Sequence, residues 1–152
     1  DVFTHTMMVL DEAAKYRADV SDPFGFMLTA LAHDFGKAIC TEIIGGKICS
    51  YNHETKGLPL VKKFLRRITS ENKLIEYVLN LTEHHMRPNQ LAAQGSSVKA
   101  TNKMFDLAIA PKDLLLFAKA DHLGRLITEP SADHQDFLKE RLAVFQEIME
   151  KL

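Results

Sequence analysis

Histidine and aspartate side chains recur along this chain on segments that otherwise have the apolar character of core helices. The clearest case is the doublet His33-Asp34, which closes an apolar stretch. The other members of the set are spread widely over the sequence: His5, His53, the pair His84-His85, and Asp121. Imidazole suits borderline metals and carboxylate suits harder ones, so a mixed set favours Mn, Fe, Ni, Co or Mg over a structural zinc. The sequence therefore predicts a site for a divalent metal ion.

Helical periodicity predicts that several of these side chains face the core. A helix expected over residues 3–17 has an apolar face that includes His5. In the helix expected after Ser70, the apolar period reaches His85 at its next step, so His85 rather than His84 is expected to point inward.

Two carboxylates fall in positions where an isolated negative charge would be costly. The helix that opens at Pro111 places Asp121 on its apolar stripe, and Asp34 ends a helix that is apolar on almost every side. A buried charge requires a counter-ion or a metal. Adjacent helical residues diverge by about 100°, yet at a helix end both can turn toward one cavity. His33 can then bind one metal while Asp34 bridges to a second.

The remaining predicted elements make the fold all-α with a small β-hairpin. Asp22 should cap the central helix and Gly36 should end it, while Asn52 should cap the helix that starts at His53. The helix carrying His85 is expected to end at Arg87-Pro88. In full, the central helix is expected over 24–33, a hairpin over 42–49, and further helices from 53, over 98–108, from 111 and over 133–151. Because no repeat or linker divides the chain, we expect one domain.

Composition excludes several classes of protein. The net charge of −1 and the pI near 6.7 provide no broad attraction for nucleic acid or anionic lipid. No window approaches the roughly 18 apolar residues of a membrane span. Cys40 and Cys49 are spaced too widely for a redox pair, and we expect reduced thiols in a cytoplasmic protein. The chain begins at Asp1 without a starting methionine, so we interpret it as a domain excised from a longer protein.

At this point the residues carry a family resemblance. The run Ala32-His33-Asp34-Phe35-Gly36-Lys37, preceded by His5 and followed by Asp121, resembles the signature of HD-domain metal-dependent phosphohydrolases. More narrowly, residues 1–11, 52–54 and 119–125 are similar to the HD domain that follows the nucleotidyltransferase head in bacterial CCA-adding tRNA nucleotidyltransferases, of the poly(A) polymerase family. The resemblance covers nearly the whole chain. It identifies residues 1–152 as a single HD domain that lacks the N-terminal head.

The resemblance implies an HD-domain helical bundle with a particular ligand set. His5, His33, Asp34 and Asp121 would bind a first metal, and in two-metal relatives the residues matching His53 and His85 hold the second. The implied activities are those of a 2',3'-cyclic phosphodiesterase, a 2'-nucleotidase and a phosphatase, with tRNA ends or small nucleotides as substrates. Because the head is missing, the fragment should not add CCA by itself.

The working hypothesis is therefore metal-dependent hydrolysis of a phosphoester or nucleotide. Asp34 would orient the attacking water, while Lys37 and Arg125 would neutralise the negative charge of the phosphate. One alternative is a non-catalytic module for tRNA contact or dimerisation, favoured by the basic pairs Lys62-Lys63 and Arg66-Arg67. A second alternative is a nucleotide or alarmone hydrolase of another HD subfamily. The sequence leaves the natural substrate, the metal and the oligomeric state open.

Overall fold

A central apolar helix, α2 (Pro23–Ala32), organises the fold in the computed structural model, which describes residues 1–125 and 132–152. Its start follows the sequence prediction, because the Asp22 side chain accepts a hydrogen bond from the Gly25 backbone N–H and Pro23 occupies the first turn. Helices α1, α6 and α9 pack around α2. Most of α2 is buried: Gly25, Phe26, Leu28, Thr29, Ala30 and Ala32.

The other described elements follow one another along the chain with short connections. They are α1 (Val2–Ala14), the 3₁₀ turn η1 (Arg17–Asp19), α3 (Lys37–Cys40), β1 (Glu42–Ile44), β2 (Lys47–Cys49), α4 (His53–Lys56), α5 (Leu58–Arg66), α6 (Asn72–His84), α7 (Arg87–Gln94), α8 (Val98–Leu107), α9 (Pro111–Leu123) and α10 (Ala132–Glu150).

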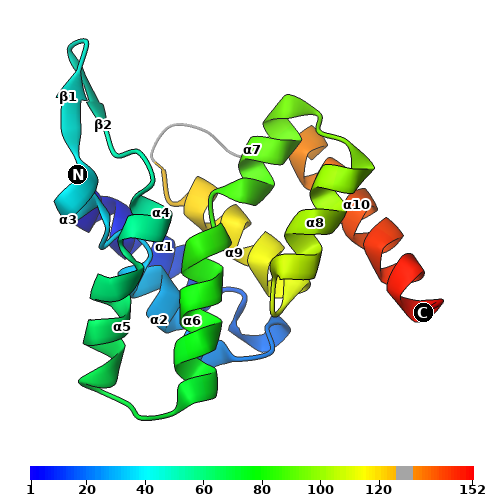
Figure 1. The fold of residues 1–152 in the computed structure, drawn as a ribbon, viewed down its shortest axis with the longest axis horizontal. Helices are drawn as coiled ribbons and strands as arrows, with labels where there is room; N and C mark the ends of the chain where they lie inside the picture. Colours follow the sequence, from blue (N-terminus) through cyan, green and yellow to red (C-terminus); the bar gives the residue numbers. More distant parts are fainter. Residues whose placement is uncertain (126–131) are drawn as a thin grey trace.

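These elements form two groups of helices joined by α9 (Figure 1). One group contains α1, α2, α5 and α6, and the other contains α7, α8 and α10, with α9 in contact with both. The antiparallel hairpin of β1 and β2 projects from one end of the molecule, and Ile43 lies opposite Ile48 in its register (Figure 1). Both isoleucines are exposed. The all-α prediction with a small hairpin is confirmed.

Several boundaries differ from those predicted. Gly36 does not end the central helix: α2 stops at Ala32, and Gly36 instead precedes the short helix α3. The helix expected after Ser70 is α6, which starts at Asn72 with Glu71 at the cap position. Asn52 precedes α4 in a left-handed conformation, with φ of 60°, and its side chain makes no capping hydrogen bond.

Helix α7 was not predicted from the sequence. The pair Arg87-Pro88 was interpreted as the end of the preceding helix, but Pro88 lies in the first turn of α7. Proline is compatible with that position because a first-turn N–H has no partner within the helix. Helix α6 already ends at His84, so Pro88 marks the start of α7 and not the end of α6.

A buried polar network closes the fold at the start of α2. The backbone N–H and the hydroxyl of Ser21 donate to Asp113 Oδ2 at 3.0 and 2.6 Å, and the Tyr77 hydroxyl donates to the same oxygen at 2.7 Å. Burial and the Asp113 carboxylate raise the pKa of Tyr77, which keeps its hydroxyl a donor. The network joins the segment before α2 to α6 and α9.

None of the helices described for residues 1–125 and 132–152 combines the length and the apolar character needed to cross a bilayer. Cys40 and Cys49 are both free thiols, as expected.

Two glycines allow the turn after α2 to contact α4 closely. A Cβ atom on Gly57 would lie 2.6 Å from Gly36 Cα and 2.7 Å from the His53 carbonyl oxygen. A Cβ atom on Gly36 would also collide with that carbonyl oxygen. These are backbone atoms, so the collision cannot be relieved by rotating a side chain. The contact fixes His53 beside the His33-Asp34 turn.

We predict that Gly57→Ala destabilises the protein by about 1–3 kcal/mol, because the added methyl forces the two backbones apart. Denaturant unfolding monitored by circular dichroism measures this change. Gly46→Ala in the hairpin is the comparison variant, because its added methyl meets no atom within 4 Å. Any loss of stability in that variant reports only the backbone strain of an alanine at a φ of 77°. Equal stability of Gly57→Ala and the unmodified chain would contradict the role given to this contact.

Candidate metal centre

The doublet His33-Asp34 lies just beyond the last residue of α2, where the chain leaves the helix. His33 occupies the C-cap position, and the following residues form a turn before α3. Both side chains are almost completely buried. The sequence expectation that both residues turn toward one cavity at the helix end is confirmed, because each contacts the same group of side chains.

Four imidazole rings are anchored in the same way. In each ring Nδ1 lies within hydrogen-bond distance of a backbone carbonyl oxygen: His5 with Gly124 at 3.1 Å, His33 with Ala30 at 2.9 Å, His53 with Ser50 at 3.0 Å, and His85 with Thr82 at 2.6 Å. Because a carbonyl oxygen only accepts, each Nδ1 carries the hydrogen. The Nε2 atom of a neutral ring is then left with a free lone pair. This anchoring is typical of histidines that bind metal.

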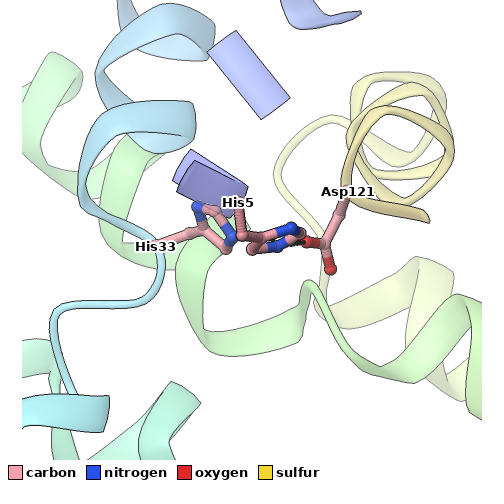
Figure 2. Close-up of side chains that lie close together, drawn as sticks. All are labelled: His5, His33 and Asp121. Atoms are coloured by element: carbon pink, nitrogen blue, oxygen red, sulfur yellow. Dashed lines mark hydrogen bonds and ion pairs between the residues drawn. The ribbon is translucent and has the colours of Figure 1, made fainter. Parts of the chain in front are cut away.

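The Nε2 atoms of His5 and His33 converge on the carboxylate of Asp121, which projects from α9. His5 Nε2 lies 2.8 Å from Asp121 Oδ1, and His33 Nε2 lies 3.3 Å from the same oxygen. Figure 2 shows the three side chains pointing toward one another from α1, from the end of α2 and from α9. Three segments far apart in the sequence therefore supply one cluster.

Asp34 faces different histidines with its two oxygens. Its Oδ2 atom lies 3.3 Å from His33 Nε2 and 3.6 Å from His5 Nε2. Its Oδ1 atom lies 3.0 Å from His53 Nε2 and 3.8 Å from His85 Nε2. The carboxylate thus stands between one pair of histidines and the other, which is the position expected for a bridging ligand.

Buried atoms without hydrogen bonds support a cation at this centre. His33 Nε2, His53 Nε2, His85 Nε2 and Asp34 Oδ2 are buried, and none makes a hydrogen bond within the described part of the chain. Two groups of three residues, His5 with His33 and Asp121, and His33 with Asp34 and His85, each place one ligand atom per residue within 4.8 Å of one another. The contacts of these atoms are ion pairs within the cluster and with Lys37, and their convergence fits a divalent metal ion.

The electrostatics of the cluster differ from one ring to the next. Burial alone would lower the pKa of His33, but the adjacent carboxylates of Asp121 and Asp34 raise it to about 10. Burial would raise the pKa of Asp34, yet His33 and His53 hold it well below its usual range. Burial and the neighbouring His33 charge lower the pKa of His85 to about 4. His33 therefore holds a proton at neutral pH whenever the centre lacks a metal.

The other predicted site residues lie at different distances from the cluster. Lys37 Nζ lies 3.0 Å from Asp34 Oδ2 and reaches the cluster from α3. His84 belongs to neither group of possible ligands among the described residues, and its Nε2 atom lies 3.6 Å from a carboxylate oxygen of the neighbouring Glu83. Arg125 is exposed and directly follows Gly124, whose carbonyl anchors His5, and its predicted role in substrate binding stays a prediction.

The carbonyl anchors were not foreseen from the sequence. For His33, His53 and His85 the acceptor is the carbonyl three residues earlier, which identifies the local geometry of a helix end or a turn. Every residue has a backbone carbonyl group, so the sequence contains no residue type that identifies which carbonyl will anchor a histidine.

Two hollows border the centre. One has a volume of about 610 Å³ and includes Asp34 and Lys37 in its lining. The second has a volume of about 560 Å³ and includes His53 and Lys37. Lys37 therefore stands between two spaces that lead to the same cluster.

Comparison with known families agrees with this geometry. The family model described as HD domain matches residues 2–126, and the chain belongs to this family. The matched segment contains all six clustered histidine and aspartate residues.

Three curated relatives carry the printed name multifunctional CCA protein. The protein of Shewanella frigidimarina is 34% identical over 136 residues, which covers 87% of this chain and 31% of the relative. That of Vibrio parahaemolyticus is 33% identical, covering 82% of this chain and 30% of the relative. That of Actinobacillus pleuropneumoniae serotype 5b is 26% identical, covering 83% and 31%. The chain thus spans about a third of the length of these relatives. No solved structure gives a significant match.

We predict that metal binding releases a proton from His33, because the ring cannot hold a proton and a metal on Nε2 at once. His33 is protonated below a pKa of about 10. The apparent affinity for Mn²⁺ should therefore rise about tenfold per pH unit between about pH 6.5 and about pH 8.5. Titration calorimetry in buffers of different ionisation enthalpy measures both the affinity and the released protons. An affinity independent of pH would contradict this prediction.

The neighbouring histidines His84 and His85 provide a matched pair of variants. His85 is 1% exposed with its Nε2 atom in the cluster, whereas His84 lies outside it. We predict that His85→Ala weakens binding of a metal ion by at least about tenfold, and that His84→Ala leaves it unchanged. Metal analysis after equilibrium dialysis distinguishes the two variants. The reverse pattern would show that His84 is the ligand.

Proposed function

We propose that this chain is a metal-dependent phosphohydrolase domain of a tRNA nucleotidyltransferase-like protein, acting as a 2',3'-cyclic phosphodiesterase, 2'-nucleotidase or phosphatase. The observation that carries the proposal is the shared anchoring of four histidines, whose Nε2 atoms face two buried carboxylates. The match to the HD domain family and the similarity to multifunctional CCA proteins support it.

In this proposal the cluster divides into two ligand groups that share Asp34. His5, His33, Asp34 and Asp121 would hold a first divalent ion. His53 and His85, with the other oxygen of Asp34, would hold a second. A divalent ion at such a site supplies Lewis-acid activation of the phosphoryl group and of water. Ions compatible with these nitrogen and oxygen ligands include Mg, Mn, Ni, Co and Fe.

The chain's own residues supply positioning and charge. Asp34, held ionised by its histidine neighbours, accepts a hydrogen bond from the attacking water and orients it. Lys37 Nζ is close enough to Asp34 to fix that carboxylate, and its partly exposed position lets it also meet a phosphate oxygen. Arg125, at the end of α9, would add a second positive charge. The buried walls around His33 and His85 exclude bulk water from the cluster.

We predict that Asp34→Ala abolishes hydrolysis of bis-p-nitrophenyl phosphate while the helical content stays intact. The reason is that Asp34 contacts both groups of histidines, so its loss disrupts both ligand sets. The release of p-nitrophenol with added Mn²⁺, Ni²⁺, Co²⁺ or Mg²⁺ measures activity, and circular dichroism measures the fold. The control is Asp106→Ala, an exposed carboxylate on α8, a helix that contributes no side chain to the cluster. Full activity of Asp34→Ala would overturn the assignment.

A second candidate function is a non-catalytic module that contacts tRNA. It is favoured by the exposure of all four basic side chains on and just after α5, Lys62, Lys63, Arg66 and Arg67. Metal-free purified protein that binds tRNA and hydrolyses no phosphoester would support this candidate. Metal-containing protein with activity on cyclic nucleotides, 2'-nucleotides or polyphosphate nucleotides would support the hydrolase and identify its substrate class.

A further inference from the structure

The larger of the two hollows beside the cluster has mostly apolar walls and one charged end. Phe3, Leu31, Phe35 and Ala38 line its apolar part, and Asp34 and Lys37 belong to the same lining. A molecule that fills this space therefore meets apolar surface along most of its length. The end of that molecule beside Lys37 must be anionic, because it meets the lysine ammonium group and the metal cluster.

The aromatic side chains of the apolar walls differ in exposure. Phe35 is half-buried and is held edge-to-face against Phe64, with ring centroids 5.4 Å apart. Phe3 projects from the first turn of α1 and is 71% exposed. An exposed aromatic ring at the rim of an apolar space offers a face on which another flat ring can stack.

The second hollow has a different lining on the other side of Lys37. It contains Thr41, Ser50 and Tyr51 as well as His53, so hydroxyl groups and an imidazole border it. These polar groups stand among apolar side chains such as Ile48 and Met86. The hydroxyl groups can hydrogen-bond to a sugar, whereas Thr6 supplies the hydroxyl group in the lining of the first hollow.

We propose that the apolar hollow binds the flat base of a nucleotide whose phosphate lies at Lys37 and Asp34, with Phe3 as a specificity-determining contact. This proposal rests on the proposed phosphohydrolase function and adds the substrate's recognition to it. The volume of about 610 Å³ lies in the range of small-molecule sites. A nucleotide combines the two properties that the lining requires, because an apolar flat ring and an anionic phosphate stand at opposite ends of one molecule.

Removing the Phe3 ring tests the stacking contact. For adenosine 2',3'-cyclic phosphate we expect Phe3→Ala to lower kcat/KM about tenfold, through a higher KM. The reference substrate is methyl riboside 2,3-cyclic phosphate, which has the same cyclic phosphate without a base. The preference for the nucleotide over this reference should fall about tenfold. Phe24→Ala is the matched control, because Phe24 is also exposed, at 61%, and does not line the hollow.

Filling the hollow provides a second test that does not depend on turnover. Ala38→Trp adds a large side chain to the lining, whereas Ile39→Trp alters the next residue, which is 61% exposed and outside the lining. Titration calorimetry of metal-free protein with adenosine 2'-monophosphate should show at least about tenfold weaker binding for Ala38→Trp only. The affinity for Mn²⁺ in both variants reports whether the cluster is intact.

The outcomes separate this proposal from the proposed function. Equal effects of Phe3→Ala on the nucleotide and on the base-free reference would overturn the base site while leaving hydrolysis established. Unchanged nucleotide binding in Ala38→Trp would also overturn it. A chain that binds the nucleotide in the hollow but hydrolyses neither compound would retain the base site and contradict the hydrolase.

Discussion

Two buried carboxylates beside four imidazole rings impose the constraint on which the rest of this structure depends. Asp34 and Asp121 are each 3% exposed, and an ionised carboxylate in such a position is stable only beside positive charge. Protons on the histidines can provide that charge, and a divalent ion can replace them. The helices α1, α2, α6 and α9 are arranged so that these histidine and aspartate residues meet at one point, although the inner faces of the helices are mostly apolar.

The main chain, rather than other side chains, determines the direction in which the histidines point. Each Nδ1 is paired with a carbonyl oxygen, so the rings are oriented before any cation binds. The close contact between Gly36 and Gly57 places one of these rings, and the network around Asp113 fixes the opposite end of α2. The contact between Gly36 and Gly57 therefore serves both fold stability and the placement of His53.

Periodicity predicted much of this arrangement because burial of one helix face repeats at a fixed spacing. The inward positions of His5, His85 and Asp121 followed from that pattern, and the structure confirms them. The cap at Asp22 and the hairpin followed instead from local cap and turn residues, and the structure confirms these too. Helix α7 was missed because proline is compatible both with a helix end and with a helix start. The carbonyl anchors and the two hollows were also missed. They depend on backbone positions and on the packing of distant segments, neither of which has a residue signature.

The members of the cluster lie far apart in the sequence, so they are synthesised at different times. His5 and Asp121 are 116 positions apart, yet their side chains are in hydrogen-bond contact. During synthesis the histidines and Asp34 leave the ribosome well before α9, so the emerging polypeptide carries an incomplete set of ligands. The complete set of side chains that could hold an ion is therefore assembled late, and the first helix, which also packs against α2, gains its contacts with α9 only when translation has nearly passed through this region.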